Sequence, residues 1–293
     1  MIEARWKRAL EALVVGAALL FLGLSLYRGW EEAGRCLRDA RPWPLALSFA
    51  LTLLHLLLGA LGWRMAVRHL GGALELRRGM RVYFLSNLGR YLPGTFWYAA
   101  GRAYLGQQED VPTALIATSL AMEVALILVS GALLSALALP SLLPGRGGLY
   151  LLAAVAALGL AALHPRPMNF LLGLLARLLH HQRVGCVAGY PLGLLALYLL
   201  IWAVAGAAFF LLLGSIYPVP LAWLPTVAAI YAASWIVGFL TPFAPGGLGV
   251  REGALALLLG RYVPLPVATA AALLSRLWLT LGEAVWVAVA ARW

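Results

Sequence analysis

Long apolar stretches separated by short polar breaks fill this sequence. They lie at 9–27, 45–67, 112–139, 149–163, 191–214 and 267–291. A helix that crosses a bilayer needs roughly 20 mostly apolar residues, so these stretches predict membrane-spanning helices. Charged residues make up only 11% of the chain, which is too few to cover the surface of a soluble domain of this size. The sequence therefore predicts an all-α polytopic membrane protein with six transmembrane helices.

Two further apolar stretches are interrupted in the middle. The stretch 82–105 contains Asn87, Arg90 and Pro93-Gly94, and the stretch 223–259 contains Pro245-Gly246-Gly247 and Gly249. A Pro-Gly pair frees backbone N–H and C=O groups that lipid cannot satisfy. Such backbone survives at membrane depth only where it is buried in protein or lines a wet cavity. We therefore expect each stretch to form a re-entrant helical hairpin that turns at its Pro-Gly pair.

The predicted elements form two halves with the same plan, within a single membrane domain that covers 1–293. Residues 1–139 contain two spans, a hairpin and a span, and residues 149–293 repeat that series. With a cytoplasmic N-terminus, most Lys and Arg residues of the loops lie inside, as the positive-inside rule requires. The two hairpins then enter from opposite faces. Broken helices at matching positions of two inverted halves are typical of a transporter's binding site. We expect a multi-pass protein of a prokaryotic plasma membrane.

Several charged residues lie inside the predicted membrane segments: Arg90, Arg102, Glu123, Arg251, Glu252, Arg276 and Glu283. A charge near the bilayer centre costs about 3 kcal/mol on insertion scales, so these residues should face a polar interior. Three of the arginines lie beside the Pro-Gly breaks, where a guanidinium, a helix N-terminus and glycine N–H groups together suit a phosphate. An alternative stays open. Arg276 with Glu283, and Glu123 with a hairpin arginine, could form ion pairs that only hold the bundle together.

Arg251 and Glu252 directly follow the glycine-rich break, so we expect them in the first turn of the returning helix. The helix dipole favours Glu252 at this position and opposes Arg251. An arginine kept in a membrane against its own helix dipole needs an anion. The candidates are Glu123, Glu283 and the phosphate of a lipid.

These motifs resemble a known family. The run Asn87–Gly94, Arg102 downstream and the run Pro245–Glu252 are similar to the flippase-like membrane domain of lysylphosphatidylglycerol synthases, which also occurs as a stand-alone protein. The resemblance covers essentially the whole chain. It implies movement of lipids between leaflets, notably of aminoacylated phosphatidylglycerol. No soluble segment exceeds about 30 residues, which leaves no room for the aminoacyl-transfer domain of the full synthases. We therefore expect no synthase activity.

The leading hypothesis is a flippase or transporter for a phosphate-bearing lipid of the phosphatidylglycerol or polyprenyl-phosphate type. The predicted substrate-binding residues are Asn87, Arg90, Pro93, Gly94, Arg102, Glu123, Pro245, Gly246, Gly247, Gly249, Arg251, Glu252, Arg276 and Glu283. We expect no catalytic residue, metal, cofactor or nucleic acid. Membrane lipids are the expected partners, and a second copy of the chain or a separate soluble synthase stays open. The alternatives are an integral-membrane enzyme of lipid metabolism and a non-transporting platform for a soluble lipid-modifying enzyme.

The inverted topology can be tested by labelling single cysteines from either side of the membrane. Gln108 follows the first predicted hairpin and Arg261 follows the second. Cysteines at these two positions should therefore react with an impermeant reagent from opposite sides, Gln108→Cys from the cytoplasmic side. Labelling of both cysteines from one side would show that one hairpin is a full span, and the inverted plan would fail.

Overall fold

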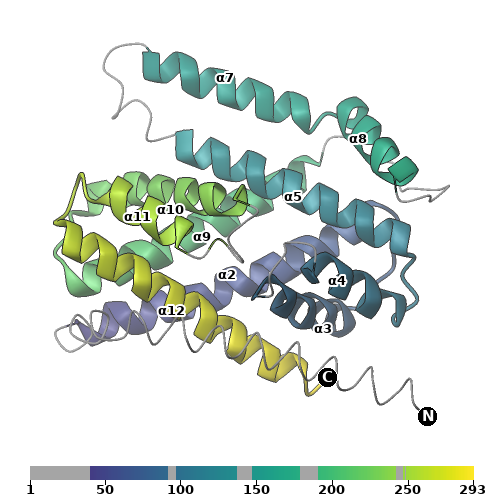
Figure 1. The fold of residues 1–293 in the computed structure, drawn as a ribbon, viewed down its shortest axis with the longest axis horizontal. Helices are drawn as coiled ribbons and strands as arrows, with labels where there is room; N and C mark the ends of the chain where they lie inside the picture. Colours follow the sequence, from purple (N-terminus) through teal and green to yellow (C-terminus); the bar gives the residue numbers. More distant parts are fainter. Residues whose placement is uncertain (1–39, 92–96, 137–146, 179–190, 242–246, 248) are drawn as a thin grey trace.

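The computed structural model describes residues 40–91, 97–136, 147–178, 191–241, 247 and 249–293, and all regular elements in these ranges are helices (Figure 1). The predicted all-α class is confirmed for this part of the chain. The α-helices are α2 (Pro42–His69), α3 (Leu76–Asn87), α4 (Trp97–Gln107), α5 (Thr113–Ala136), α7 (Gly147–Ala162), α8 (Pro165–Leu178), α9 (Leu192–Ile216), α10 (Leu224–Phe239), α11 (Val250–Leu259) and α12 (Leu265–Ala290), and the 3-10 helices are η1 (Leu88–Tyr91) and η2 (Leu221–Trp223).

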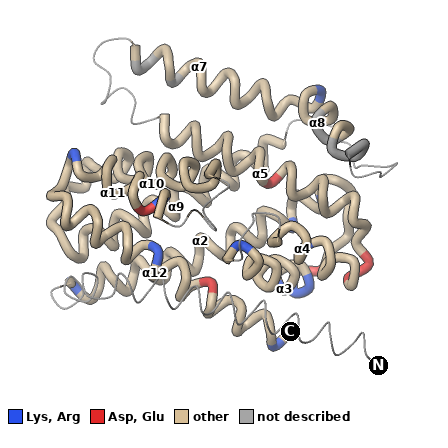
Figure 2. Tube along the Cα trace, viewed as in Figure 1, with Lys and Arg blue, Asp and Glu red and all other residues tan. Residues whose placement is uncertain are grey.

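Five of the described helical segments are long and apolar enough to cross a membrane: α2, α5, α9, α12 and the segment Leu221–Phe239, which joins η2 and α10. Four of them coincide with predicted spans. The predicted span 9–27 lies outside the described residues. The predicted span 149–163 forms α7, whose 16 residues are fewer than those of the other spans. Figure 2 shows long stretches of helix without charge, and it also shows blue and red bands within the length of α12.

Both interrupted stretches form pairs of packed helices with a break between them. We call α3, η1 and α4 the first helix pair, and α10 and α11 the second helix pair. The first pair begins at Leu76 and not at 82. The arginines that precede the apolar run have a high helix propensity, so the helix extends through them. Pro93, Gly94, Pro245 and Gly246 lie outside the described residues. Gly247 and Gly249 are described, and both have positive φ angles, 70° and 79°, which glycine adopts without steric cost.

The antiparallel helices α2 and α9 form the centre of the bundle. The Arg41 N–H donates to the Ser215 carbonyl at 2.9 Å and joins the start of α2 to the end of α9. The first helix pair follows α2, and the second follows α9, so the two pairs lie at opposite ends of the bundle (Figure 1). Helices α5 and α12 each contact both α2 and α9, and α7 and α8 pack outside α5.

Aromatic side chains fasten the helix pairs to this scaffold. Phe84 of the first pair stacks on Trp286 of α12, with 5.2 Å between ring centroids. In the second pair, Trp235 packs edge-on against Trp202 of α9 at 5.5 Å. The Trp202 indole also donates to the Ile127 carbonyl of α5. Each pair is therefore held by an aromatic contact to a long helix, which fixes the position of the residues near its break.

Glycine allows the helices before and after each break, which we call the arms of the pair, to approach each other closely. A Cβ atom on Gly89 would lie 2.6 Å from the backbone carbonyl carbon of Trp97, and one on Gly238 would lie 2.7 Å from the Cβ of Arg251. No side chain fits at such distances without moving the opposite arm. The residues that face the interior of the bundle from both arms are thereby brought together.

Candidate functional site

A cavity of about 170 Å³ lies between the two helix pairs and the central helices. Its apolar wall includes Leu56, Ile127, Ile201, Trp202, Trp235 and Phe239. Its charged lining residues are Arg90, Arg102, Glu123, Arg251 and Arg276. A basic cavity inside an apolar bundle is the arrangement that the intramembrane charges predicted.

The structure brings many of the predicted site residues to this cavity. Those that line it are Asn87, Arg90, Arg102, Glu123, Gly247, Arg251 and Arg276. Glu252 and Glu283 form ion pairs with lining arginines. The Gly249 N–H donates to the Glu252 carboxylate at 2.7 Å, so this glycine helps to position a paired acid.

Arg102 is fully engaged by protein groups and only 1% exposed. Its Nη1 donates to Glu123 at 2.5 Å, its Nη2 to the Asn87 side chain at 2.8 Å and its Nε to Ser86 at 3.1 Å. The rings of Trp63 and Tyr83 lie 4.8 and 4.4 Å from its guanidinium carbon, within cation–π range. Arg102 therefore joins α3, α4 and α5, and little of it remains for a ligand.

Arg90 is tied to α12. Its Nη1 donates to Glu283 at 2.6 Å, and the Tyr91 hydroxyl donates to the other oxygen of the same carboxylate. The Glu283 side chain is 6% exposed, whereas that of Arg90 is 29% exposed. Arg90 thus has a buried carboxylate as its partner, while part of its own side chain remains exposed.

Arg276 links α12 to both helix pairs. Its Nη1 lies 3.8 Å from the Glu252 carboxylate of the second pair, and its guanidinium carbon lies 5.7 Å from the ring centre of Tyr91 in the first. The alternative pairing of Arg276 with Glu283 is wrong, because each of them pairs with a residue of a different helix. The alternative pairing of Glu123 with a hairpin arginine is confirmed by its bond to Arg102.

Arg251 has a different environment. It occupies the first turn of α11, as predicted, and is 4% exposed. No described carboxylate lies within 4.0 Å of its nitrogens, since both predicted acidic partners, Glu123 and Glu283, bind other arginines. Its Nη2 donates to the Tyr231 hydroxyl at 2.6 Å. Of the ion pairs around the cavity, none includes Arg251, so its positive charge is not neutralised by the described residues.

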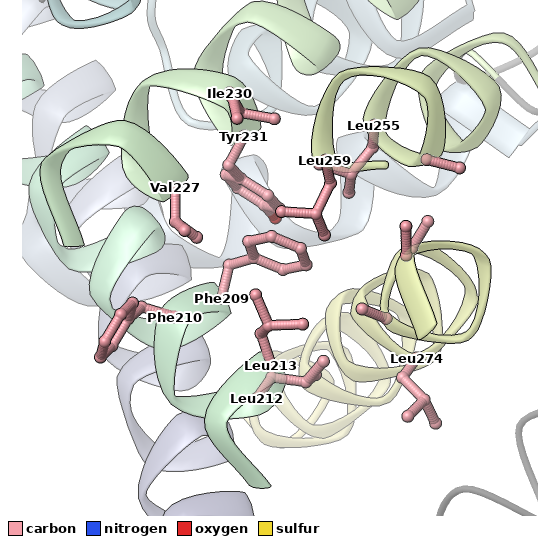
Figure 3. Packing of buried hydrophobic residues seen from close by; sticks show 14 of the residues in the cluster. Phe209, Phe210, Leu212, Leu213, Val227, Ile230, Tyr231, Leu255, Leu259 and Leu274 are labelled. Carbon is pink, nitrogen blue, oxygen red and sulfur yellow. The ribbon is translucent and has the colours of Figure 1, made fainter. Parts of the chain in front are cut away.

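Tyr231 is a rigid support for Arg251. Its ring stacks on Phe209 with 4.9 Å between centroids and belongs to an apolar cluster with Leu255 and Leu259 (Figure 3). Because these contacts fix the ring, the hydroxyl can hold the guanidinium in one place without cancelling its charge. Arg251 is therefore both positioned and available to an anion.

Sequence reasoning missed the tyrosines of this cavity. Tyr83, Tyr91, Tyr98 and Tyr198 all line it. The Tyr198 hydroxyl is buried and has no hydrogen-bond partner among the described residues. For Tyr198, its position within the apolar helix α9 is the signal that could have indicated it, because a buried hydroxyl needs a polar partner. Among the described residues, no group of three or more His, Cys, Asp or Glu could hold a metal ion.

Comparison with known families identifies the kind of domain. The family model described as lysylphosphatidylglycerol synthase TM region matches residues 9–282. The chain belongs to this family. The resemblance seen in the sequence motifs is thus confirmed, and the chain is a multi-pass membrane protein of a family related to lipid modification and transport. No curated protein matches it.

The buried pair of Arg102 and Glu123 predicts a large stability effect. Glu123→Gln removes the carboxylate and leaves a buried guanidinium without its counter-charge, which should destabilise the protein by about 3–5 kcal/mol. The matched control is Glu75→Gln. Glu75 pairs with Arg78 on the surface, where an ion pair contributes about 0–1 kcal/mol. Equilibrium unfolding in mixed micelles measures the free energy of unfolding of both variants. Equal stability of the two variants would contradict a structural role for Glu123.

Proposed function

We propose that this protein moves a phosphate-bearing lipid between the leaflets of its membrane. The phosphate of a phosphatidylglycerol-type or polyprenyl-phosphate-type lipid binds in the cavity, with Arg251 as its main ligand and Arg90 beside it. The lipid chains stay in the bilayer. Arg102 and Glu123 act as positioning residues, because their contacts are to each other and to the surrounding helices.

The charge of Arg251 is the observation that carries this proposal. An unneutralised guanidinium in a membrane interior is costly, and the protein spends stability to keep it beside a cavity. A phosphate suits a guanidinium because two of its oxygens can accept two parallel hydrogen bonds from the planar guanidinium fork. A platform that only anchors a soluble enzyme would not need such a buried charge.

The contacts between helices support an inverted repeat. If α2, the first pair and α5 correspond to α9, the second pair and α12, each contact in one half has a counterpart in the other. The corresponding contacts are α2–α3 with α9–α10, α3–α4 with α10–α11, α4–α5 with α11–α12, α2–α5 with α9–α12, α2–α12 with α9–α5, and α3–α12 with α10–α5. A pseudo-two-fold axis between α2 and α9 would generate this pattern.

The ion pairs follow the same correspondence with their charges exchanged. In the first half, Arg102 of the returning helix pairs with Glu123 of the following span. In the second half, Glu252 of the returning helix pairs with Arg276 of the following span. In this proposal the two helix pairs enter from opposite faces, and the lipid binds at the repeat interface, as substrates do in transporters of inverted-repeat architecture.

Substitution of Arg251 tests the function directly. Arg251→Gln removes the anion ligand but leaves no carboxylate unpaired, so the protein should keep nearly its wild-type stability. Loss of a charge-assisted hydrogen bond to phosphate costs about 1.5–3 kcal/mol, so transport should fall by about tenfold or more. The measurement is the rate at which fluorescent phosphatidylglycerol changes leaflet in vesicles that contain the purified protein.

Arg261→Gln is the matched control, because Arg261 is exposed beyond the end of α11. It should move lipid at the wild-type rate. A folded Arg251→Gln protein with that same rate would remove Arg251 from the site and leave the proposed function without its main support.

A further inference from the structure

A second and much smaller cavity adjoins the lipid site. It has a volume of about 10 Å³, enough for about one water molecule, and lies among α2, α9, α10 and α12. Thr52, His55, Tyr231 and Ser275 supply its polar lining. His55 also lines the large cavity, as does Arg251, whose partner is the Tyr231 hydroxyl. The imidazole therefore stands between the two spaces.

A buried polar path leads from His55 toward the start of α2. Ser48, Thr52 and His55 follow one another at helical spacing, so they share one face of α2. Ser48 and Thr52 are both buried, the Thr52 hydroxyl donates to the Ser48 carbonyl, and the Trp278 indole donates to the Ser48 hydroxyl. This row of hydroxyls in an otherwise apolar helix leads toward the end of the bundle opposite the first helix pair.

The hydrogen bond of His55 leaves one ring nitrogen as an acceptor. Its Nδ1 lies 3.3 Å from the Ile201 carbonyl oxygen. A carbonyl can only accept, so Nδ1 carries the hydrogen of the neutral ring, and Nε2 is left as the acceptor. Protonation at Nε2 would give an imidazolium that keeps its bond to Ile201.

The charges around His55 link its proton to an anion. The polar and charged groups that face it are the Ile201 carbonyl of α9, Tyr231 of α10, Arg251 of α11, Arg90 of η1 and Ser275 of α12. Arg251 and Arg90 line the large cavity together with His55, and their positive charges disfavour an imidazolium there. A phosphate bound between them would offset that repulsion. By linkage, if the bound anion raises the proton affinity of the imidazole by some factor, the bound proton raises the affinity for the anion by the same factor.

We propose that His55 takes up a proton when the large cavity binds an anionic headgroup, so that lipid movement is coupled to proton movement. Water in the small cavity delivers the proton to Nε2, and the same proton leaves when the headgroup departs. No other bond forms or breaks. This inference rests on the proposed function, because it requires an anion at Arg251.

The test uses short-chain phosphatidylglycerol, whose phosphodiester does not titrate near neutral pH, so that any proton taken up belongs to the protein. Affinity for the purified protein is measured by titration calorimetry between pH 8 and pH 5.5. Binding should tighten as the pH falls, by at most about tenfold per pH unit for one linked proton. His55→Gln should bind with an affinity that does not change with pH. His69→Gln, at the exposed end of α2, should behave as the wild type.

A second measurement does not depend on any variant. In weakly buffered solution with a pH indicator, wild-type protein should take up protons when phosphatidylglycerol is added. Binding without proton uptake, or a pH dependence that survives in folded His55→Gln, would overturn the coupling and leave the lipid site intact. Absence of any phosphatidylglycerol binding by the wild type would overturn the coupling and the anion site together.

Discussion

A charge inside a bilayer must be neutralised or must face a polar space, and the structure of this protein depends on that requirement. Ion pairs between Arg102 and Glu123, Arg90 and Glu283, and Arg276 and Glu252 each join a helix pair to a long helix. The α12 helix carries Glu283 for the first pair and Arg276 for the second. The broken segments are therefore held by electrostatic contacts near their breaks, in addition to the aromatic contacts farther along.

The same requirement separates structure from function among the arginines. Arg102 is enclosed by a carboxylate, an amide, a hydroxyl and aromatic rings. Its role is therefore structural. Arg251 is held by Tyr231 alone among the described residues, and its charge remains for a ligand. Both arginines are buried, with 1% of Arg102 and 4% of Arg251 exposed, and both follow a break in the sequence. The identity of their neighbours distinguishes them.

The general plan could be predicted from the sequence because hydropathy and backbone chemistry leave few choices in lipid. The spans at α2, α5, α9 and α12 were predictable, and so was a break within each helix pair. The partners of the charges were not. Arg276 and Glu283 share a helix stripe, yet seven residues separate them by roughly 10 Å along the axis, so each pairs across to another helix. The tyrosines were missed because their role depends on packing that no periodicity records.

An experimental structure in a bilayer disc that contains phosphatidylglycerol tests the central claim most directly. The account predicts a lipid phosphate in the large cavity, within hydrogen-bond distance of the Arg251 guanidinium and beside Arg90, with the three ion pairs intact. A cavity in which Arg251 instead contacts a carboxylate of the protein, while the lipid phosphates stay at the membrane surface, would contradict it.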